Sequence, residues 1–368
     1  MTSPKYIHFV SQYAAPYKGN FIPSLELLEQ SLCEYSVIHT FPIKADNQPW
    51  MQDFKKRHIV RFTDDNVRSF QSVQQLVAIF TEFPPSLIHT HFDGYDVSVI
   101  KAAKAFNCNI VWHMHNWLDF MPNIIKKMYQ YWCFFRHYGL AAKRNVYLIS
   151  VCEEMRRFAS KFGFPSKQTI TIPNGIDISR FELPAPRPTK LKPFVFLAFG
   201  GRNSSKRIDL ICEAVKWLPS ELPFEVQITQ GTDTEQVINR GGYHNIQKIK
   251  LIQQKGNVQS LYSNAHCFIS SSIHETFSYA IAEASLCGCA IIQSDISGTE
   301  WNREGAATWV FPSEDVQALA DCMIQVMNEN ETIMKESCLA ASEFIQQNYS
   351  LCAWRDKILQ FYNDHKLI

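Results

Sequence analysis

Two carboxylates, Glu275 and Glu283, stand around the predicted start of a helix. Cys267–Ile269 is an apolar run typical of a buried strand, and Phe277–Leu286 has the apolar spacing of a helix. Ala290–Ile292 predicts the next strand, so we interpret the whole stretch as one βαβ unit. Ligands of open α/β sheets bind at the carboxyl ends of the strands, which is where Glu275 would lie.

Between these two carboxylates lie the backbone N–H groups of the helix's first turn, which lack partners within the helix and can bind a phosphate. A nucleotide-linked sugar carries hydroxyl-rich rings on both sides of a diphosphate. Carboxylates accept hydrogen bonds from ring hydroxyls, while the helix start takes the phosphate. The residue types therefore suggest a sugar-nucleotide site. The spacing of Glu275 and Glu283 alone is equally compatible with a surface helix that has an acidic first turn.

A second strand-to-helix turn carries cations suited to a diphosphate. Phe194–Phe199 predicts a strand and Ile208–Leu218 a helix, and the turn between them contains Gly201, Arg202, Lys206 and Arg207. An arginine can donate two parallel hydrogen bonds to phosphate oxygens, and a lysine supplies a compact charge. The turn has neither the spacing of a Walker loop nor a GxGxxG pattern, which disfavours a nicotinamide or flavin site.

Histidines close two predicted strands of the first half. His89 and His91 end one strand, and His113 and His115 end the next. Two such pairs on neighbouring loops favour a binding site over purely structural imidazoles. No acidic residue stands at helix spacing from them, so we predict no metal site. Earlier in the chain, Gly19 precedes a predicted helix and would let the backbone approach a ligand closely.

Strand-like runs alternate with helical patterns along both halves of the chain, which predicts an α/β fold with parallel sheets. The length of 368 residues favours two domains. A stretch with four prolines, flanked by charged residues, reads as a linker rather than an element. We predict an N-terminal Rossmann-like domain at residues 1–180, a linker at 181–193, a C-terminal Rossmann-like domain at 194–347 and a last helix at 348–368.

Composition describes an ordinary globular protein. The net charge of +1 gives no overall attraction to nucleic acid, and eleven scattered cysteines argue against a disulfide framework. The N-terminus lacks the pattern of a signal peptide and no apolar run is long enough to span a bilayer, so we expect a cytoplasmic protein. Residues 124–144 mix basic and aromatic residues, and this helix could rest on an anionic membrane face or pack as a core helix.

The motifs together resemble a known family, the nucleotide-sugar-dependent glycosyltransferases of family 4. The resemblance rests on GGRNSSKRID, on HETFSYAIAEA and on the boundary motif IPNGIDISRF, and it is strongest between Val146 and Glu300. It implies the GT-B fold, in which two Rossmann-like domains face across a cleft and the C-terminal helix returns to the N-terminal domain. It also implies a retaining transferase that needs no metal or other cofactor.

The resemblance assigns roles to individual residues. Glu275 would hold the hydroxyls of the donor sugar and Glu283 would bind the nucleotide ribose. Arg202 and Lys206 would neutralise the diphosphate, although the spacing leaves Arg207 equally possible as the second cation. His115 would lie by the sugar. The remaining residues of the predicted site are Gly19, Gly201, Phe277, Ser278 and Tyr279 for the donor, and His91, His113 and Asn174 for an acceptor or sugar pocket.

At two positions the chain departs from the family pattern, with Thr276 and Ser278 where glycine is usual. Their hydroxyls could narrow the sugar pocket, so the resemblance does not name the donor sugar. The favoured interpretation is transfer from a nucleotide-diphosphate sugar to a glycan or lipid-linked saccharide, as in the synthesis of cell-surface polysaccharides. A nucleotide-sugar epimerase of the same architecture and a non-catalytic sugar-nucleotide-binding protein remain the alternatives.

Overall fold

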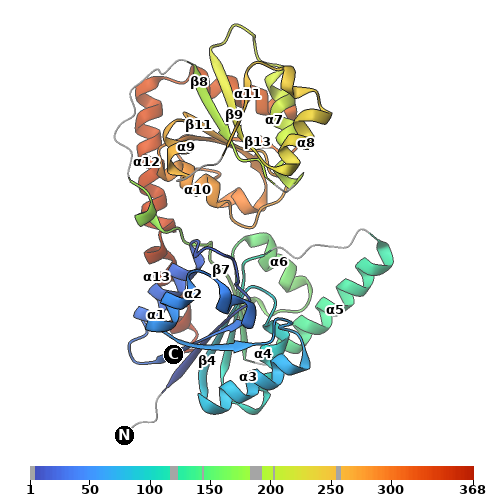
Figure 1. Ribbon diagram of the computed structural model, residues 1–368, viewed down its shortest axis with the longest axis vertical. Helices are drawn as coiled ribbons and strands as arrows, with labels where there is room; N and C mark the ends of the chain where they lie inside the picture. The colour runs from blue at the N-terminus through green and yellow to red at the C-terminus, as the bar shows by residue number, and fades with distance from the viewer. Residues whose placement is uncertain (1–4, 117–122, 143–144, 183–192, 202–203, 254–257) are drawn as a thin grey trace. The chain divides into compact units, whose positions relative to one another are not determined.

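The computed structural model describes residues 5–116, 123–142, 145–182, 193–201, 204–253 and 258–368. Its contacts divide the chain into two compact units (Figure 1). Unit 1 comprises Met1–Gly175 and Leu351–Ile368, and unit 2 comprises Ile176–Ser350. The last helix therefore belongs to the N-terminal unit, as expected. Most of the predicted linker, residues 183–192, lies outside the described residues, so the predicted boundary there stays a prediction.

Unit 1 is built on a seven-stranded parallel sheet with the order β3-β2-β1-β4-β5-β6-β7. Its strands are β1 (Tyr6–Ser11), β2 (Ser36–Pro42), β3 (Ile59–Thr63), β4 (Pro85–His91), β5 (Asn109–Met114), β6 (Val146–Ser150) and β7 (Thr169–Thr171). Its α-helices are α1 (Phe21–Gln30), α2 (Met51–Arg57), α3 (Phe70–Glu82), α4 (Asp96–Ala102), α5 (Ile124–Ala142), α6 (Glu153–Lys161) and α13 (Leu351–Asp364).

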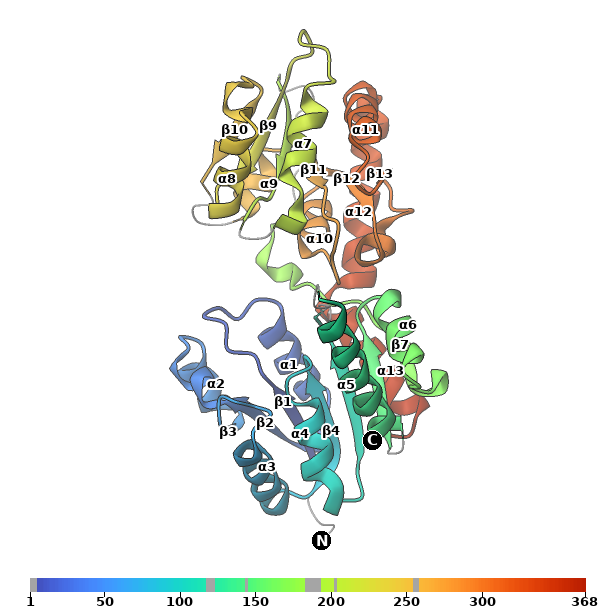
Figure 2. The ribbon, with the colours of Figure 1, turned by 90° about the vertical axis from the view of Figure 1, so that its right-hand side faces the viewer.

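Unit 2 is built on a six-stranded parallel sheet with the order β10-β9-β8-β11-β12-β13 (Figure 2). Its strands are β8 (Phe194–Ala198), β9 (Phe224–Thr229), β10 (Ile249–Ile252), β11 (Cys267–Ser270), β12 (Ala290–Asp295) and β13 (Thr308–Pro312). Its α-helices are α7 (Ile208–Val215), α8 (Thr232–Arg240), α9 (Gln259–Ser263), α10 (Tyr279–Leu286), α11 (Val316–Asn328) and α12 (Glu331–Tyr349).

Each sheet buries both faces under helices, which explains why its strands read as apolar runs. In unit 1, α13 covers the face that carries Phe9, because Trp354, Ile358 and Tyr362 on this helix are buried in the same core cluster. Full burial of such side chains contributes about 2 kcal/mol each. The sequence-predicted fold class, two Rossmann-like parallel-sheet domains, is confirmed.

Two strands were missed by the sequence analysis. β3 lies at one edge of the sheet of unit 1, and β13 lies at one edge of the sheet of unit 2. Both are largely half-exposed, so their side chains do not form the continuous apolar run of a central strand. Helix α10 also begins at Tyr279, two residues later than predicted.

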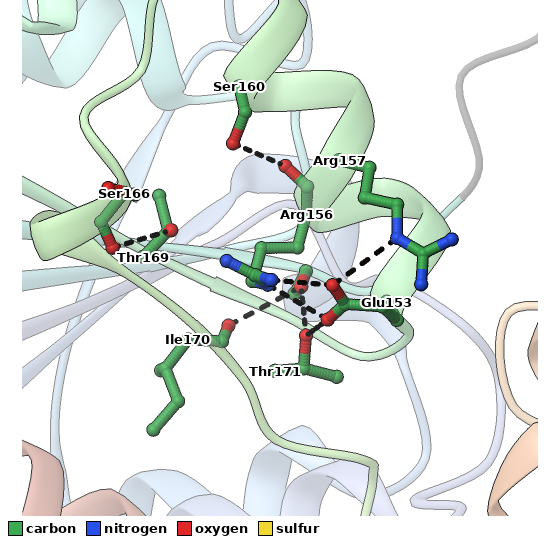
Figure 3. Close-up of polar contacts among 9 residues, drawn as sticks. Glu153, Arg156, Arg157, Ser160, Ser166, Thr169, Ile170 and Thr171 are labelled. Atoms are coloured by element: carbon green, nitrogen blue, oxygen red, sulfur yellow. Dashed lines mark hydrogen bonds and ion pairs between the residues drawn. The ribbon is translucent and has the colours of Figure 1, made fainter.

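Helix α6 is fastened to the edge of the sheet of unit 1 by Glu153 in its first turn (Figure 3). The carboxylate of Glu153 accepts a hydrogen bond from Arg156 Nε at 2.8 Å and another from Thr171 Oγ1 at 2.9 Å. The hydrogen bond from Arg156 holds the pKa of Glu153 below its usual range. This contact sets the chain path of the segment that runs into the boundary motif.

Both sheets reverse their strand order once, between the first and the fourth strand of each unit. In unit 1 the reversal lies between β1 and β4, and in unit 2 it lies between β8 and β11. Loops that leave neighbouring strands at such a point diverge to opposite faces of the sheet and leave a crevice where α/β proteins bind ligands. In unit 2 the described predicted site residues lie on the segments that follow β8 and β11. In unit 1, Gly19 and His115 follow β1 and β5, His91 and His113 lie near the ends of β4 and β5, and Asn174 follows β7.

Candidate active site

Lys206 and Glu275 form an ion pair at the strand-order reversal of unit 2. Lys206 ends the short 3₁₀ turn Ser204–Lys206 after β8, and Glu275 lies in the loop between β11 and α10. The strands β8 and β11 are paired in the sheet, so the two loops emerge side by side. The side chains of Lys206 and Glu275 are 33% and 15% exposed, so the pair is reachable from solvent.

Two hydrogen bonds hold these loops together. Ser271 Oγ donates to the carbonyl oxygen of Lys206 at 2.8 Å, and the backbone N–H of Ile273 donates to the carbonyl oxygen of Ser205 at 2.9 Å. The hydroxyl of Ser272 donates to Glu275 Oε1 at 2.9 Å and orients the carboxylate. The position of Lys206 relative to Glu275 is therefore fixed by the backbone as well as by charge.

A glycine permits the close packing behind Glu275. A Cβ atom on Gly298 would lie 2.1 Å from the carbonyl oxygen of Glu275, a distance that real Cβ contacts do not reach. Gly298 belongs to the 3₁₀ helix Ser297–Asn302, which follows β12. Any larger residue at this position would push the loop that carries Glu275 out of place.

Arg207, the other candidate for the second cation, lies differently from Lys206. Its left-handed backbone, with φ of 47°, caps α7, and its guanidinium donates to both carboxylate oxygens of Asp209. It also forms an ion pair with Glu314. The hydrogen bond to Asp209 raises the pKa of Arg207. Two carboxylates thus occupy Arg207, whereas the ammonium of Lys206 is beside Glu275.

Glu283 lies on α10 with a half-buried carboxylate. Tyr262 donates its hydroxyl hydrogen to Glu283 Oε2 at 3.1 Å, and Arg180 Nη1 lies 3.9 Å from Oε1. Burial raises the pKa of Glu283, and the nearby Arg180 opposes that shift. A carboxylate held in this way can accept hydrogen bonds from sugar hydroxyls in a region with little water.

Phe277 and Ser278, at the start of α10, have different structural roles. The ring of Phe277 is buried and stacks on Trp301 with centroids 5.0 Å apart, so this side chain belongs to the core. Ser278 is buried at the N-cap and makes no side-chain capping hydrogen bond. The backbone N–H groups at the start of α10 are candidates for contact with a phosphate.

On the other loop, the N–H of Gly201 donates to Thr234 Oγ1 at 2.9 Å. Arg202, predicted as a diphosphate ligand, lies outside the described residues. A pocket of about 220 Å³ opens beside Gly201, with Arg207, Asp209 and Asp233 in its lining. Its two carboxylates make it a poor place for a diphosphate, and it does not include Lys206 or Glu275.

The residues predicted in unit 1 also lie together. His115 Nδ1 is 2.9 Å from Asn174 Oδ1, and His115 Nε2 is 3.2 Å from His91 Nδ1. The ring of His113 stacks on that of His115 with centroids 4.1 Å apart. Burial lowers the pKa of His115 to about 4, so its imidazole is neutral at physiological pH. Gly19, with φ of 57°, lies just before α1.

Two family models of glycosyltransferases match this chain. A family model described as Glycosyltransferase Family 4 matches residues 30–180, and one described as Glycosyl transferases group 1 matches residues 193–329. The chain belongs to the family 4 glycosyltransferases. This glycosyltransferase is also 20% identical over 281 residues to an uncharacterized glycosyltransferase of Methanocaldococcus jannaschii, MJ1059, a match that covers 67% of each chain.

Solved structures share the GT-B fold of this glycosyltransferase. A glycosyltransferase from Rickettsia africae superposes with a TM-score of 0.79 at 15% identity, over 99% of both chains. Alr3699/HepE of Anabaena, solved in complex with UDP and glucose, superposes with a TM-score of 0.73 at 16% identity, over 98% of this chain and all of that one. Within the part of the chain that the structure describes, no helix is long and apolar enough to cross a membrane.

Several residues around the glycosyltransferase's candidate site escaped the sequence analysis. Ser271, Ser272 and Gly298 support Glu275, and Tyr262 and Arg180 contact Glu283. The run of three serines at the end of β11 was a signal, since polar residues that follow a buried strand belong to the ligand end of the sheet. Arg180 and Tyr262 are distant from Glu283 in sequence, and only packing brings them together.

Proposed function

We propose that this glycosyltransferase moves a sugar from a nucleotide-diphosphate donor to a glycan or lipid-linked saccharide, with retention of the anomeric configuration. The observation that carries the proposal is the Lys206–Glu275 pair at the strand-order reversal of unit 2. In this pair a cation and Glu275, the carboxylate proposed to bind the sugar, lie side by side at the ligand end of the sheet. An ammonium has three donors, so Lys206 can serve Glu275 and a phosphate oxygen together.

The proposed chemistry follows from charge. Breaking a sugar–phosphate bond develops negative charge on the leaving diphosphate, which Lys206, Arg202 and the N–H groups at the start of α10 would stabilise. Glu275 would hold the sugar hydroxyls, and Glu283 would accept hydrogen bonds from the ribose. Because protein cations neutralise the diphosphate, the transfer is proposed to need no metal at the donor site. Turnover is therefore expected to survive EDTA.

A uridine nucleotide is the first donor class to test. The structure of Alr3699/HepE contains UDP, which supports this choice for a chain of the same fold. In unit 1, Gly19 is proposed to approach the phosphate and His115 to contact the sugar, with His91, His113 and Asn174 supporting His115. A thermal-shift screen of UDP, GDP, ADP and their sugars would name the donor, because a bound ligand raises the unfolding midpoint by mass action.

Replacement of the sugar-binding carboxylate tests the proposal. Glu275→Ala is expected to lower transfer about 100-fold, with the unfolding midpoint preserved. Glu300→Ala, at an exposed glutamate of the same unit, is the matched control and should leave transfer unchanged. Retention is checked by NMR of the anomeric proton of the product. Undiminished transfer by Glu275→Ala, or a donor sugar altered without release of diphosphate, would contradict the assignment.

We propose further that the acceptor is met at the cytoplasmic face of a membrane, through helix α5. One side of α5 packs into the core through Tyr138 and Ala141. Large apolar side chains elsewhere on the helix are 41% to 74% exposed: Ile124, Ile125, Met128, Tyr129, Tyr131, Trp132 and Phe135. Lys126, Lys127 and Arg136 accompany them, and the Arg136 guanidinium lies 4.8 Å from the ring of Trp132.

An exposed aromatic stripe with basic neighbours matches the interface of a bilayer that carries anionic lipids. Flotation with vesicles of phosphatidylcholine and phosphatidylglycerol should carry the protein upward, and the double substitution Trp132→Ala with Phe135→Ala should abolish this. Trp217→Ala removes a tryptophan that is 60% exposed in unit 2 and is the matched control. If the unsubstituted protein stays at the bottom of the gradient, the membrane proposal fails.

A further inference from the structure

Three histidines of unit 1 lie against one another inside the protein. His89 and His91 alternate along β4, and His113 is the residue of β5 that pairs with His91. Their side chains therefore share one face of the sheet. The ring centroids of His89 and His91 are 4.2 Å apart, and each lies 5.4 Å from that of His113. All three residues have no exposed surface.

These imidazoles carry ring nitrogens without partners. His89 Nε2, His91 Nε2 and both nitrogens of His113 are buried and have no hydrogen-bond partner among the described residues. A neutral imidazole must carry one N–H, so an interior of this kind leaves donors and acceptors unsatisfied. Buried polar atoms in folded proteins are almost always paired with protein groups, water or an ion. The described residues therefore leave these ring nitrogens without the partner that a buried imidazole requires.

The hydrogen bonds that the cluster does make have the pattern seen around metal-binding histidines. His89 Nδ1 lies 2.5 Å from the hydroxyl of Tyr362 on α13, and His91 Nδ1 lies 3.2 Å from His115 Nε2. In both residues one nitrogen is oriented by a neighbour and Nε2 remains available. Metal-ligating histidines are held in this way, with the second ring nitrogen bonded to an outer group.

We propose that His89, His91 and His113 bind one transition-metal ion of the Zn²⁺ class within unit 1. One nitrogen from each residue lies within 4.8 Å of the others. Three nitrogens around one zinc ion, each about 2 Å from it, would be about 3.3 Å apart, so binding requires the nitrogens to approach one another by up to about 1.5 Å. Three imidazoles with a water or hydroxide as the fourth ligand is an established zinc coordination.

Two observations favour a metal ion, rather than a proton or another polar group, as the missing partner of these histidines. Burial lowers the pKa of all three histidines well below the usual value, so they are neutral and can ligate at physiological pH. A second cluster in the same unit, of Glu29, His39 and His58, behaves differently. In that cluster His39 Nε2 and His58 Nδ1 lie against the Glu29 carboxylate, which gives each histidine a partner from the chain itself.

The proposal does not depend on the transferase activity, because its test measures bound metal, although His91 and His113 also lie against His115, which is proposed to contact the sugar. A resident ion would stabilise β4, β5 and α13 rather than take part in diphosphate release. His115, the partly exposed neighbour of His91, lies where β5 ends and marks the side from which an ion would enter.

Titration of the EDTA-treated full-length protein with Co²⁺ tests the site. One Co²⁺ per chain, with the intense visible bands of tetrahedral coordination, is expected, and Zn²⁺ should displace it and raise the unfolding midpoint. His91→Phe and His113→Phe keep an aromatic ring but remove the ligand nitrogens, and each should abolish the Co²⁺ bands. His8→Phe, at another buried histidine of the same sheet, should retain them.

Zinc-edge X-ray absorption of the unsubstituted protein keeps the test informative if the phenylalanine variants fail to fold. At least three imidazole nitrogens around the bound ion are expected. The proposal is overturned if no Co²⁺ or Zn²⁺ binds tightly, or if the bound ion has fewer than three imidazole ligands. It is equally overturned if folded His91→Phe and His113→Phe bind the ion as the unsubstituted protein does.

Discussion

The strand-order reversals of the two units use the same backbone arrangement and very different side chains. Unit 2 places an ion pair there, Lys206 with Glu275, and keeps both side chains partly exposed. Unit 1 has neutral imidazoles at the corresponding strand ends, and His91 and His113 are fully buried there. The same strand topology thus carries a charged, accessible site in unit 2 and an uncharged, tightly packed cluster in unit 1.

The two units show that the fold sets where a ligand site lies, whereas the side chains set whether the site is charged. Parallel strands that diverge at a reversal leave room for a ligand whatever their sequence. Whether a charge survives there depends on water and partners, since burial of an unpaired charge is costly. The carboxylate of Glu275 has Lys206 and Ser272, whereas His113 has no charged partner and its pKa is lowered instead.

The largest expected effect distinguishes the two cations between β8 and α7, Lys206 and Arg207. Lys206→Met is expected to lower transfer about 100-fold, because it removes a charge beside Glu275 where the diphosphate is proposed to leave. Arg207→Met should change transfer far less, since Asp209 and Glu314 already bind its guanidinium. Steady-state rates with the donor named by the thermal-shift screen make the comparison. Equal losses in both variants would remove the distinction between them.

A smaller effect is expected from loosening the loops around the ion pair. Ser271→Ala removes the hydrogen bonds to the carbonyl oxygens of Lys206 and Arg207, a net loss of about 1 kcal/mol. If the loss is felt in the transition state, turnover falls roughly fivefold. Ser220→Ala, at an exposed serine of unit 2, is the control. A Ser271→Ala enzyme with unchanged turnover would show that the Ser271 hydroxyl is not needed to hold Lys206 in place.

The smallest expected effect concerns His58 of unit 1, which remains charged, in contrast to the histidines of the strand-order reversal. Burial opposes protonation of His58, but hydrogen bonds to Glu26 and Glu29 raise its pKa to about 9. Because this pKa is raised on folding, the stabilisation is complete below pH 6.5 and is lost as the pH rises through about 9. The loss should be about 1 kcal/mol, as for a partly exposed ion pair.

Urea unfolding measured across this pH range detects that loss. His58→Gln should flatten the dependence of the unfolding free energy on pH, because glutamine does not titrate. His89→Gln should leave the dependence unchanged, since a neutral buried imidazole has no charge to lose in this range. A slope that persists in His58→Gln would assign the effect to another group.

Much of the fold could be predicted from the sequence. The predicted helix Ile208–Leu218 begins at the same residue as α7, and the apolar runs of the central strands were found because both faces of those strands are buried. The edge strands β3 and β13 escaped because they are half-exposed. The predicted roles of Glu275 and Glu283 stay predictions, and the structure adds the contacts that orient both carboxylates.

By itself, the sequence determined the alternation of strands and helices, the position of Glu275 after a strand and the family of the chain, because periodicity and motifs are local properties. Only the tertiary structure decided that Lys206 rather than Arg207 lies beside Glu275, since the left-handed backbone of Arg207 and the carboxylates of Asp209 and Glu314 lie outside any motif. It also decided that histidines from two strands meet, because strand register is a long-range property that no local pattern contains.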